Sequence, residues 1–145
     1  MTVNTATATW HGNLADGNGT VALANAFTGE YSFKSRFEGE KGTNPEELIA
    51  AAHAGCYSMA FSNELSKAGF VPKYVKTEAQ VTLAKTEAGF AITQIALLVD
   101  ADVPGVPEAT FHQLAEAAKV GCPVSKALAA VPTITLNATL QKAAA

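Results

Sequence analysis

The sequence has little charge and no long apolar run. Charged residues make up 16% of its 145 residues, and the formal net charge is −3. Because nucleic acids and anionic membrane surfaces attract basic proteins, this charge balance argues against both as partners. No apolar stretch approaches the roughly 20 residues of a membrane span, and no basic and apolar N-terminal segment indicates a signal peptide. We therefore expect a cytoplasmic protein with no nucleic acid or membrane partner.

Cysteine is also scarce, since the chain holds only Cys56 and Cys122. In a reducing cytoplasm such residues are more often reactive or simply buried than joined in a structural disulfide. They form no CxxC motif, and the cysteines and histidines lack the paired spacing of a zinc site. The sequence also lacks a phosphate-binding glycine loop and the GxSxG and HExxH motifs. We therefore expect no metal and no bound cofactor.

What the chain does contain is enough apolar surface for one core. Hydrophobic residues make up 48% of the sequence, and its length fits a single domain spanning residues 1–145. The order of the predicted elements is strands, helix, strands, helices, strand, which predicts an α+β fold with mostly antiparallel pairing. The expected strands lie at residues 5–12, 20–24, 31–37, 74–86, 90–101 and 133–141, and the later helices at residues 108–120 and 123–130.

The longest predicted element is a helix that begins at Pro45 and ends before Gly69. Asn44 suits the N-cap position, Pro45 suits the first helical position, and Glu47 falls three residues after the cap. Nearly every face of this helix is apolar or small, which predicts that other elements surround it. Cys56 lies about three turns into the helix, where a thiol would be held rigidly and shielded from bulk water.

Four residues of the chain can carry chemistry, and each also has a structural interpretation. Cys56 is either a buried packing residue or a reactive thiol. Cys122 precedes Pro123 at a predicted helix start, where free N–H groups lower a thiol pKa, or it is a poorly filled cap. His53 lies on the same helical face as Cys56 and is either a base or a packing residue. Arg36, at the end of a predicted strand, can stabilise a thiolate, although most arginines do not.

Three stretches of the sequence closely resemble the osmotically inducible protein C (OsmC) family. They are Arg36–Cys56, Ala88–Thr93 and Gly121–Ser125, and the likeness extends from Trp10 to the last strand. Within the superfamily, the Arg-Phe-Glu-Gly-Glu-Lys and Cys-Pro-Val-Ser runs favour the OsmC subgroup over the organic hydroperoxide resistance group. The resemblance implies an OsmC-like fold, with a long central helix and antiparallel sheets, in an intertwined homodimer that has two active sites at the subunit interface.

The same resemblance implies a thiol-dependent peroxidase of oxidative and osmotic stress defence, which reduces organic hydroperoxides and, less well, hydrogen peroxide. Carried over by position, Cys56 matches the peroxidatic cysteine and Cys122 the resolving cysteine. Arg36 and Glu46 match the active-site arginine and glutamate. An external dithiol reductant, such as dihydrolipoyl groups, would return the Cys56–Cys122 disulfide to two thiols, with no bound cofactor.

The spacing of two of these residues has a geometric consequence. Glu46 and Cys56 lie ten residues apart on the predicted helix, a separation of roughly 15 Å along its axis. Glu46 is therefore too far away to touch the Cys56 thiol of its own helix. We expect the pair of Arg36 and Glu46 to serve a thiolate of the partner subunit, so that a forced monomer is inactive.

Two other interpretations are open at this point. A non-enzymatic, stress-associated binding module on the same scaffold predicts cysteines that stay reduced when peroxide is added. A different thiol enzyme, such as a disulfide reductase or an acyl transferase, is disfavoured because there is no CxxC motif and no identifiable acidic partner for His53. Peroxide-linked consumption of a dithiol, absent with thioester substrates, separates these interpretations from the peroxidase.

Overall fold

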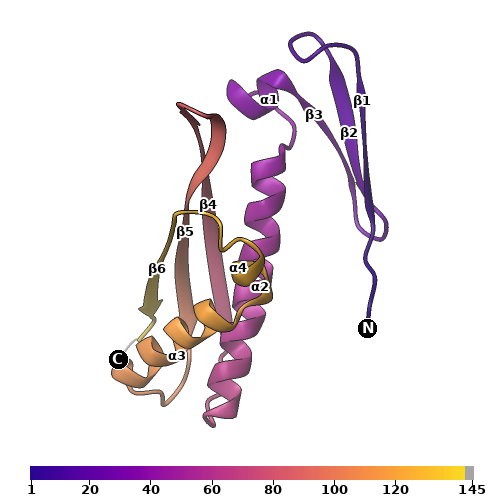
Figure 1. Cartoon of the computed structure of the whole chain (residues 1–145). Helices are drawn as coiled ribbons and strands as arrows, with labels where there is room; N and C mark the ends of the chain where they lie inside the picture. The colour runs from indigo at the N-terminus through magenta and orange to yellow at the C-terminus, as the bar shows by residue number, and fades with distance from the viewer. Residues whose placement is uncertain (143–145) are drawn as a thin grey trace. The chain divides into compact units, whose positions relative to one another are not determined.

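The computed structural model describes residues 1–142, which form two small sheets and four helices (Figure 1). By contact they fall into two compact units, residues 1–48 and the residues from 49 onward. The mixed α+β class is confirmed, whereas the single domain predicted for residues 1–145 stays a prediction and includes three residues outside the described part. The elements in chain order are β1 (Ala6–His11), β2 (Asn18–Leu23), β3 (Thr28–Ser32), α1 (Phe33–Phe37), α2 (Pro45–Lys67), β4 (Tyr74–Thr86), β5 (Gly89–Asp102), α3 (Glu108–Gly121), α4 (Pro123–Ala127) and β6 (Thr133–Leu140).

The first unit is an antiparallel meander of β1, β2 and β3, followed by α1 and the first residues of α2. Gly19 on the middle strand pairs with Trp10 on one side and Tyr31 on the other. The two rings lie 5.3 Å apart between centroids. A Cβ atom at Gly19 would approach the Thr9 carbonyl oxygen to 2.5 Å and a Tyr31 ring carbon to 2.6 Å. Only glycine therefore lets the two aromatic rings meet over the middle strand.

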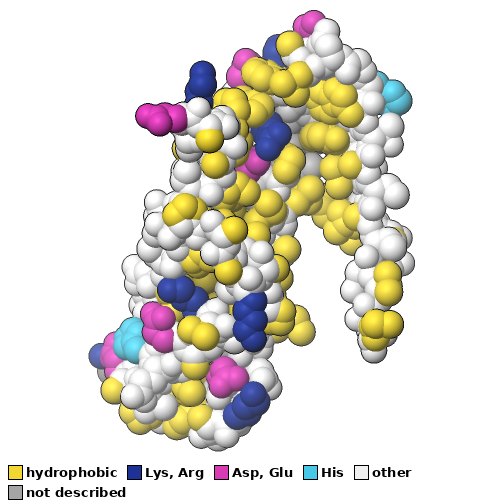
Figure 2. Space-filling model, in the orientation of Figure 1, with side chains coloured by type: hydrophobic (Ala, Val, Ile, Leu, Met, Phe, Trp, Pro, Cys, Tyr) yellow, Lys and Arg dark blue, Asp and Glu magenta, His cyan; other side chains and the backbone are white. Residues whose placement is uncertain are grey.

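The first unit has no apolar core of its own. None of the apolar side chains in residues 1–48 is buried, and Leu14 and Phe27 are 64% and 47% exposed. Figure 2 shows apolar side chains at the surface of this unit. Because a three-stranded sheet needs one face packed against another element to be stable, this unit requires a covering surface.

The strand predicted for residues 31–37 is wrong for residues 33–37. The strand ends at Ser32, and residues Phe33–Phe37 form the short helix α1. The Ser35 N–H donates to Ser32 Oγ at 3.0 Å, and the Ser32 N–H donates to Ser35 Oγ at 2.9 Å. This reciprocal capping box satisfies two backbone donors at the start of the helix, which is why the chain turns there. Arg36 consequently lies on a helix and not at the end of a strand.

The second unit is built on a sheet with the order β4-β5-β6. The antiparallel hairpin of β4 and β5 matches the predicted alternation closely. β6 pairs parallel with β5, so the pairing is mostly antiparallel with this one exception among the described strands. A parallel neighbour requires a crossover connection, and α3 and α4 supply it. None of the helices in residues 1–142 has the length and hydropathy to span a bilayer.

The core of the second unit lies between β5, α2 and α3 (Figure 1). Alternate residues of β5 point to one face and are buried there. From His53 onward, the buried residues of α2 follow one another at intervals of four, which places them on a single stripe of the helix. Phe61 and Phe111 meet edge to face with ring centroids 5.2 Å apart. The buried residues that β5 and α2 contribute to this core are Ile95, Leu97, Val99 and Ala101, and His53, Tyr57, Phe61 and Leu65.

Within residues 49–142, only one face of α2 is covered. Met59 is 76% exposed, and Ala51, Ala52 and Gly55 are exposed as well. We expected other elements to surround this helix, but in the single chain the core packs against one stripe of α2, whose residues are spaced four apart. A second apolar face of the helix stays open to solvent.

Truncation of Phe61 tests the assignment of this core. Phe61→Ala is expected to lower the free energy of unfolding by about 3–5 kcal/mol, because the cavity left between α2 and α3 can collapse only in part. The conservative variant Phe61→Leu should lose less than about 1.5 kcal/mol. Denaturant titration followed by circular dichroism measures both values, and equal losses for the two variants would contradict the assignment.

Candidate active site

The structure brings the two cysteines together. Cys56 lies midway along α2, and Cys122 lies between α3 and α4. Their Sγ atoms are 3.1 Å apart, and both are free thiols. Because a disulfide has an S–S distance near 2.05 Å, a shift of about 1 Å would allow an oxidant to join the two sulfurs in a disulfide. The two residues are thus placed to act as one redox pair.

The two thiols differ in their access to solvent. Cys122 is fully buried, whereas Cys56 is partly exposed. Cys56 and Met59 line a surface pocket of about 430 Å³, whose lining is mainly apolar and includes Pro123. A molecule that approaches from solvent therefore meets Cys56 first, and Cys122 reaches it only through Cys56.

The surroundings of the two sulfurs shift their pKa values in opposite directions. Burial raises the pKa of Cys56, and the nearby Cys122 adds to this, although the Val124 N–H opposes it. Burial also acts to raise the pKa of Cys122, but the Ser125 N–H, the Cys56 thiol, the Ser125 hydroxyl and the Val124 N–H together lower it. The Cys122 side chain makes no cap hydrogen bond at the start of α4. It nevertheless lies at the N-terminal end of this helix, where unpaired backbone N–H groups stabilise a thiolate.

Within residues 1–142, the surroundings of Cys56 therefore do not favour its thiolate. Cys56 lies in the interior of α2, where the helix itself uses the backbone N–H groups. Within residues 1–142, the groups that shift its pKa are its burial, the Val124 N–H and the Cys122 thiol, and none of these is a cation. A thiolate at Cys56 needs a positive charge from another source.

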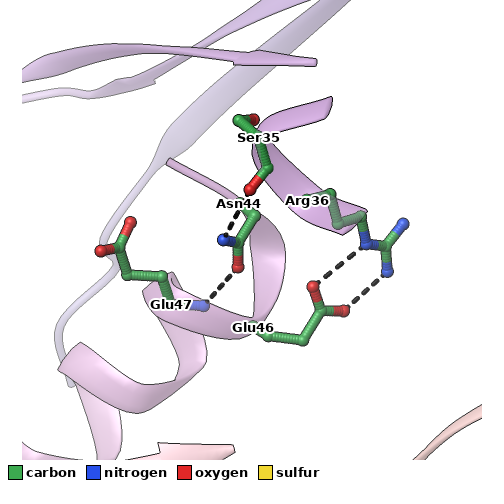
Figure 3. A network of polar contacts seen from close by, with 5 residues as sticks. All are labelled: Ser35, Arg36, Asn44, Glu46 and Glu47. Atoms are coloured by element: carbon green, nitrogen blue, oxygen red, sulfur yellow. Dashed lines mark hydrogen bonds and ion pairs between the residues drawn. The ribbon is translucent and has the colours of Figure 1, made fainter. Parts of the chain in front are cut away.

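The predicted pair of Arg36 and Glu46 forms in the first unit (Figure 3). Arg36 Nε donates to Glu46 Oε2 at 3.0 Å, and Arg36 Nη2 donates to Glu46 Oε1 at 2.7 Å. Glu46 is buried, and the Arg36 side chain is 34% exposed. The hydrogen bonds that Arg36 donates to Glu46 raise the pKa of Arg36, so its charge is permanent. A bidentate pair fixes the plane of the guanidinium and leaves its other N–H donors for a second partner.

A polar network holds the two elements that carry this pair. Asn44 Oδ1 accepts from the Glu47 N–H at 2.8 Å, which confirms Asn44 as the N-cap of α2. Asn44 Nδ2 donates to the Ser35 carbonyl of α1 at 3.5 Å (Figure 3). The Glu47 carboxylate accepts from Thr43 Oγ1 at 2.7 Å and does not close a capping box. The start of α2 is thus tied to α1, and this aligns Arg36 with Glu46.

Arg36 also lines a pocket of about 370 Å³ in the first unit. Aromatic rings dominate its lining, and the Arg36 guanidinium lies 5.3 Å from the Phe37 ring centroid. A fixed cation beside aromatic walls suits a molecule with one polar end and one apolar end. The residues that line the pocket are Trp10, Gly12, Leu14, Tyr31, Ser32, Phe33, Arg36, Phe37 and Pro45.

The four predicted site residues therefore form two pairs, one in each unit, and a further polar contact lies beside the cysteines. His53 is fully buried, and its Nε2 lies 2.7 Å from Ser125 Oγ. Sequence reasoning singled out His53 but missed Ser125. The signal was present, because Ser125 follows Cys122 by three residues at a helix start and so shares its face. Within residues 1–142, no three acidic, histidine or cysteine side chains are placed to bind a metal.

Comparison with known proteins gives concordant matches. The profile of the family described as OsmC-like protein matches residues 38–137. The chain is 51% identical to peroxiredoxin OsmC of Escherichia coli strain K12 over 127 residues, which cover 86% of this chain and 89% of that protein. The crystal structure of organic hydroperoxide resistance protein OhrB of Bacillus subtilis aligns with a TM-score of 0.68 at 26% identity, covering 94% of this chain and 98% of that one. An OsmC-like protein from Mycoplasma pneumoniae aligns with a TM-score of 0.75 at 18% identity over 97% and 99% of the two chains, which shows the fold alone.

Proposed function

The chain belongs to the OsmC-like protein family, and from this premise we propose that it is a peroxiredoxin-like, thiol-dependent peroxidase. Its substrates are organic hydroperoxides and, less well, hydrogen peroxide. The observation that carries the proposal is the 3.1 Å contact between Cys56 Sγ and Cys122 Sγ, two residues 66 positions apart. The relatives named peroxiredoxin OsmC and organic hydroperoxide resistance protein support the same class of reaction.

Cys56 is the peroxidatic residue, because it is the thiol that solvent reaches. Its thiolate attacks the distal oxygen of the hydroperoxide, the O–O bond breaks, and the alkoxide leaves as an alcohol after it takes up a proton. Cys56 becomes a sulfenic acid. The sulfur of Cys122 then attacks Cys56, water leaves, and a disulfide forms. An external dithiol, such as a dihydrolipoyl group, restores both thiols, and a reducing cytoplasm suits this cycle.

Arg36 and Glu46 supply the positive charge that the Cys56 thiolate requires. Glu46 holds the guanidinium in one plane through two hydrogen bonds, and the free N–H donors face the reacting sulfur and the peroxide oxygens. Ten residues separate Glu46 from Cys56 on one helix, so we assign this role to the Cys56 of the partner subunit. The aromatic pocket beside Arg36 accommodates the alkyl group of the substrate.

A homodimer also accounts for the uncovered apolar surfaces. The first unit has no buried apolar side chain, and the second apolar face of α2 is exposed around Met59. A second copy of the chain would cover both surfaces and complete both units. The intertwined homodimer is therefore part of the proposal, and it supplies the two composite active sites that the mechanism requires.

Intact-mass measurement with one equivalent of cumene hydroperoxide tests the proposed cycle. The native protein is expected to lose both free thiols and about 2 Da as the disulfide forms. The variant Cys122→Ser should instead gain about 16 Da, because the sulfenic acid at Cys56 has no resolving partner. Thiols that stay reduced in both proteins would contradict the proposal and favour the binding-module interpretation. Hydrolysis of a thioester without peroxide would favour a different thiol enzyme.

A further inference from the structure

The resolving step requires a destination for one proton. Cys122 must attack Cys56 as a thiolate, and the oxygen of the sulfenic acid must leave as water. Cys122 is fully buried, so no solvent molecule reaches its sulfur directly. At neutral pH, a group inside the protein that accepts the Cys122 proton and later releases it would therefore speed this step.

His53 and Ser125 form a polar chain that leads to this sulfur. Ser125 Oγ lies 2.7 Å from His53 Nε2. Ser125 follows Cys122 by three residues at the start of α4 and so lies on the same face, and its hydroxyl is among the groups that lower the pKa of Cys122. His53 is fully buried and Ser125 is 8% exposed. The contact joins α2 to α4, which lie side by side in Figure 1. Both side chains of this contact are thus buried.

The second nitrogen of His53 distinguishes this contact from a purely structural one. Within the described residues, His53 Nδ1 is buried and has no hydrogen-bond partner. A histidine usually has its tautomer fixed by the partner of its other nitrogen. Here nothing fixes it, so Nε2 is free to accept a proton from Ser125 or to donate one. Because burial lowers the pKa of His53, the ring rests in the neutral form, which is the form that accepts a proton.

We propose that His53 and Ser125 form a proton relay that activates Cys122 for the resolving step. The thiol proton of Cys122 passes to Ser125 Oγ as the hydroxyl proton of Ser125 passes to His53 Nε2. The Cys122 sulfur then forms the S–S bond, the S–O bond of the Cys56 sulfenic acid breaks, and hydroxide leaves. Cys122 is oxidised and Cys56 is reduced. The proton held on His53 returns to the hydroxide, which leaves as water, so His53 ends neutral.

This inference rests on the proposed two-cysteine function, and its test must separate the two cysteine steps. Acid-quenched single turnovers with cumene hydroperoxide, followed by intact mass, report them independently. Loss of the reduced protein gives the rate of the Cys56 step, and loss of about 2 Da gives the rate of resolution. The first rate also serves as an internal check that each variant is folded.

In Ser125→Ala the rate of the Cys56 step is expected to be native, while resolution slows by roughly 10²-fold, the scale of lost general base catalysis. Ser125→Thr is the matched control, since it keeps the hydroxyl and should resolve at the native rate. His53→Gln keeps an amide that can bond to Ser125 but cannot take up a proton, so it should resolve as slowly as Ser125→Ala. The sulfenic acid, about 16 Da heavier, accumulates in both slow variants.

The pH dependence separates a relay from a packing role. The titratable groups that adjoin the relay are Cys56 and Tyr57, three and four residues after His53 on α2, and Cys122, three residues before Ser125. Glu116 acts on Tyr57. Raising the pH toward about 9 should restore resolution in both slow variants, because the Cys122 thiol then ionises without the relay. Native resolution in Ser125→Ala or His53→Gln, or slow resolution that pH does not restore, would overturn the relay. A native protein that forms no disulfide would instead overturn the proposed function.

Discussion

Replacing Cys56 by serine is expected to abolish peroxide-dependent consumption of dithiol. The loss in kcat/KM should be roughly 10³-fold or more, equivalent to about 4 kcal/mol of transition-state stabilisation. The physical reason is that a serine hydroxyl is not ionised at neutral pH and its oxygen cannot carry the sulfenic acid that begins the cycle. A coupled assay that follows dithiol oxidation at several hydroperoxide concentrations measures the loss.

Cys122→Ser is the matched control for this experiment. It should still react once with hydroperoxide at close to the native rate, because the solvent-accessible thiol is intact, and only its disulfide formation should be lost. The opposite pattern would assign the first step to Cys122, the residue with the lowered pKa in the single chain. Substantial single-turnover oxidation in Cys56→Ser would therefore reverse the proposed roles of the two cysteines.

Most of the local structure could be predicted from the sequence, because it depends on neighbouring residues. Asn44 and Pro45 mark the start of α2, and strict alternation marks β4 and β5. The helix α1 was missed because its signal is a pair of serines, Ser32 and Ser35, inside a stretch with strand-like composition. The local chemistry of the capping box outweighed the alternation of the surrounding residues.

The site was harder to predict, because its contacts join residues that are distant in the sequence. The spacing of Cys56 and Cys122 in the sequence does not predict that they meet. Their contact depends on the crossover that places α4 beside α2. The resemblance named both cysteines, and the structure now supplies their distance. No sequence pattern indicated that His53 would meet Ser125. The second apolar face of α2 would be covered by a surface outside the single chain. The periodicity of apolar residues predicts that this face is buried but does not identify the surface that buries it.

Replacing Arg36 by alanine is expected to lower kcat/KM by roughly 10²- to 10³-fold, the loss seen when one charge-stabilising donor is removed from a transition state. Arg36→Lys should recover only part of this loss, since an ammonium group cannot form the bidentate pair with Glu46. The thiol pKa of Cys56, followed by alkylation rate against pH, should rise in Arg36→Ala. If the alkylation profile is the same in Arg36→Ala as in the native protein, Arg36 does not stabilise the Cys56 thiolate.

Mixing two inactive variants tests whether the site is shared between subunits. Subunits that carry Cys56→Ser keep Arg36, and subunits that carry Arg36→Ala keep Cys56 and Cys122. If Arg36 serves the Cys56 of the partner subunit, each mixed dimer contains one complete site. Random assortment of equal amounts makes half of the dimers mixed, so the mixture should recover about a quarter of the native activity. If Arg36 serves the Cys56 of its own chain, no mixed dimer has a complete site and the mixture stays inactive. Coexpression with two affinity tags isolates the mixed dimer, in which the composite arrangement predicts about half of the native activity.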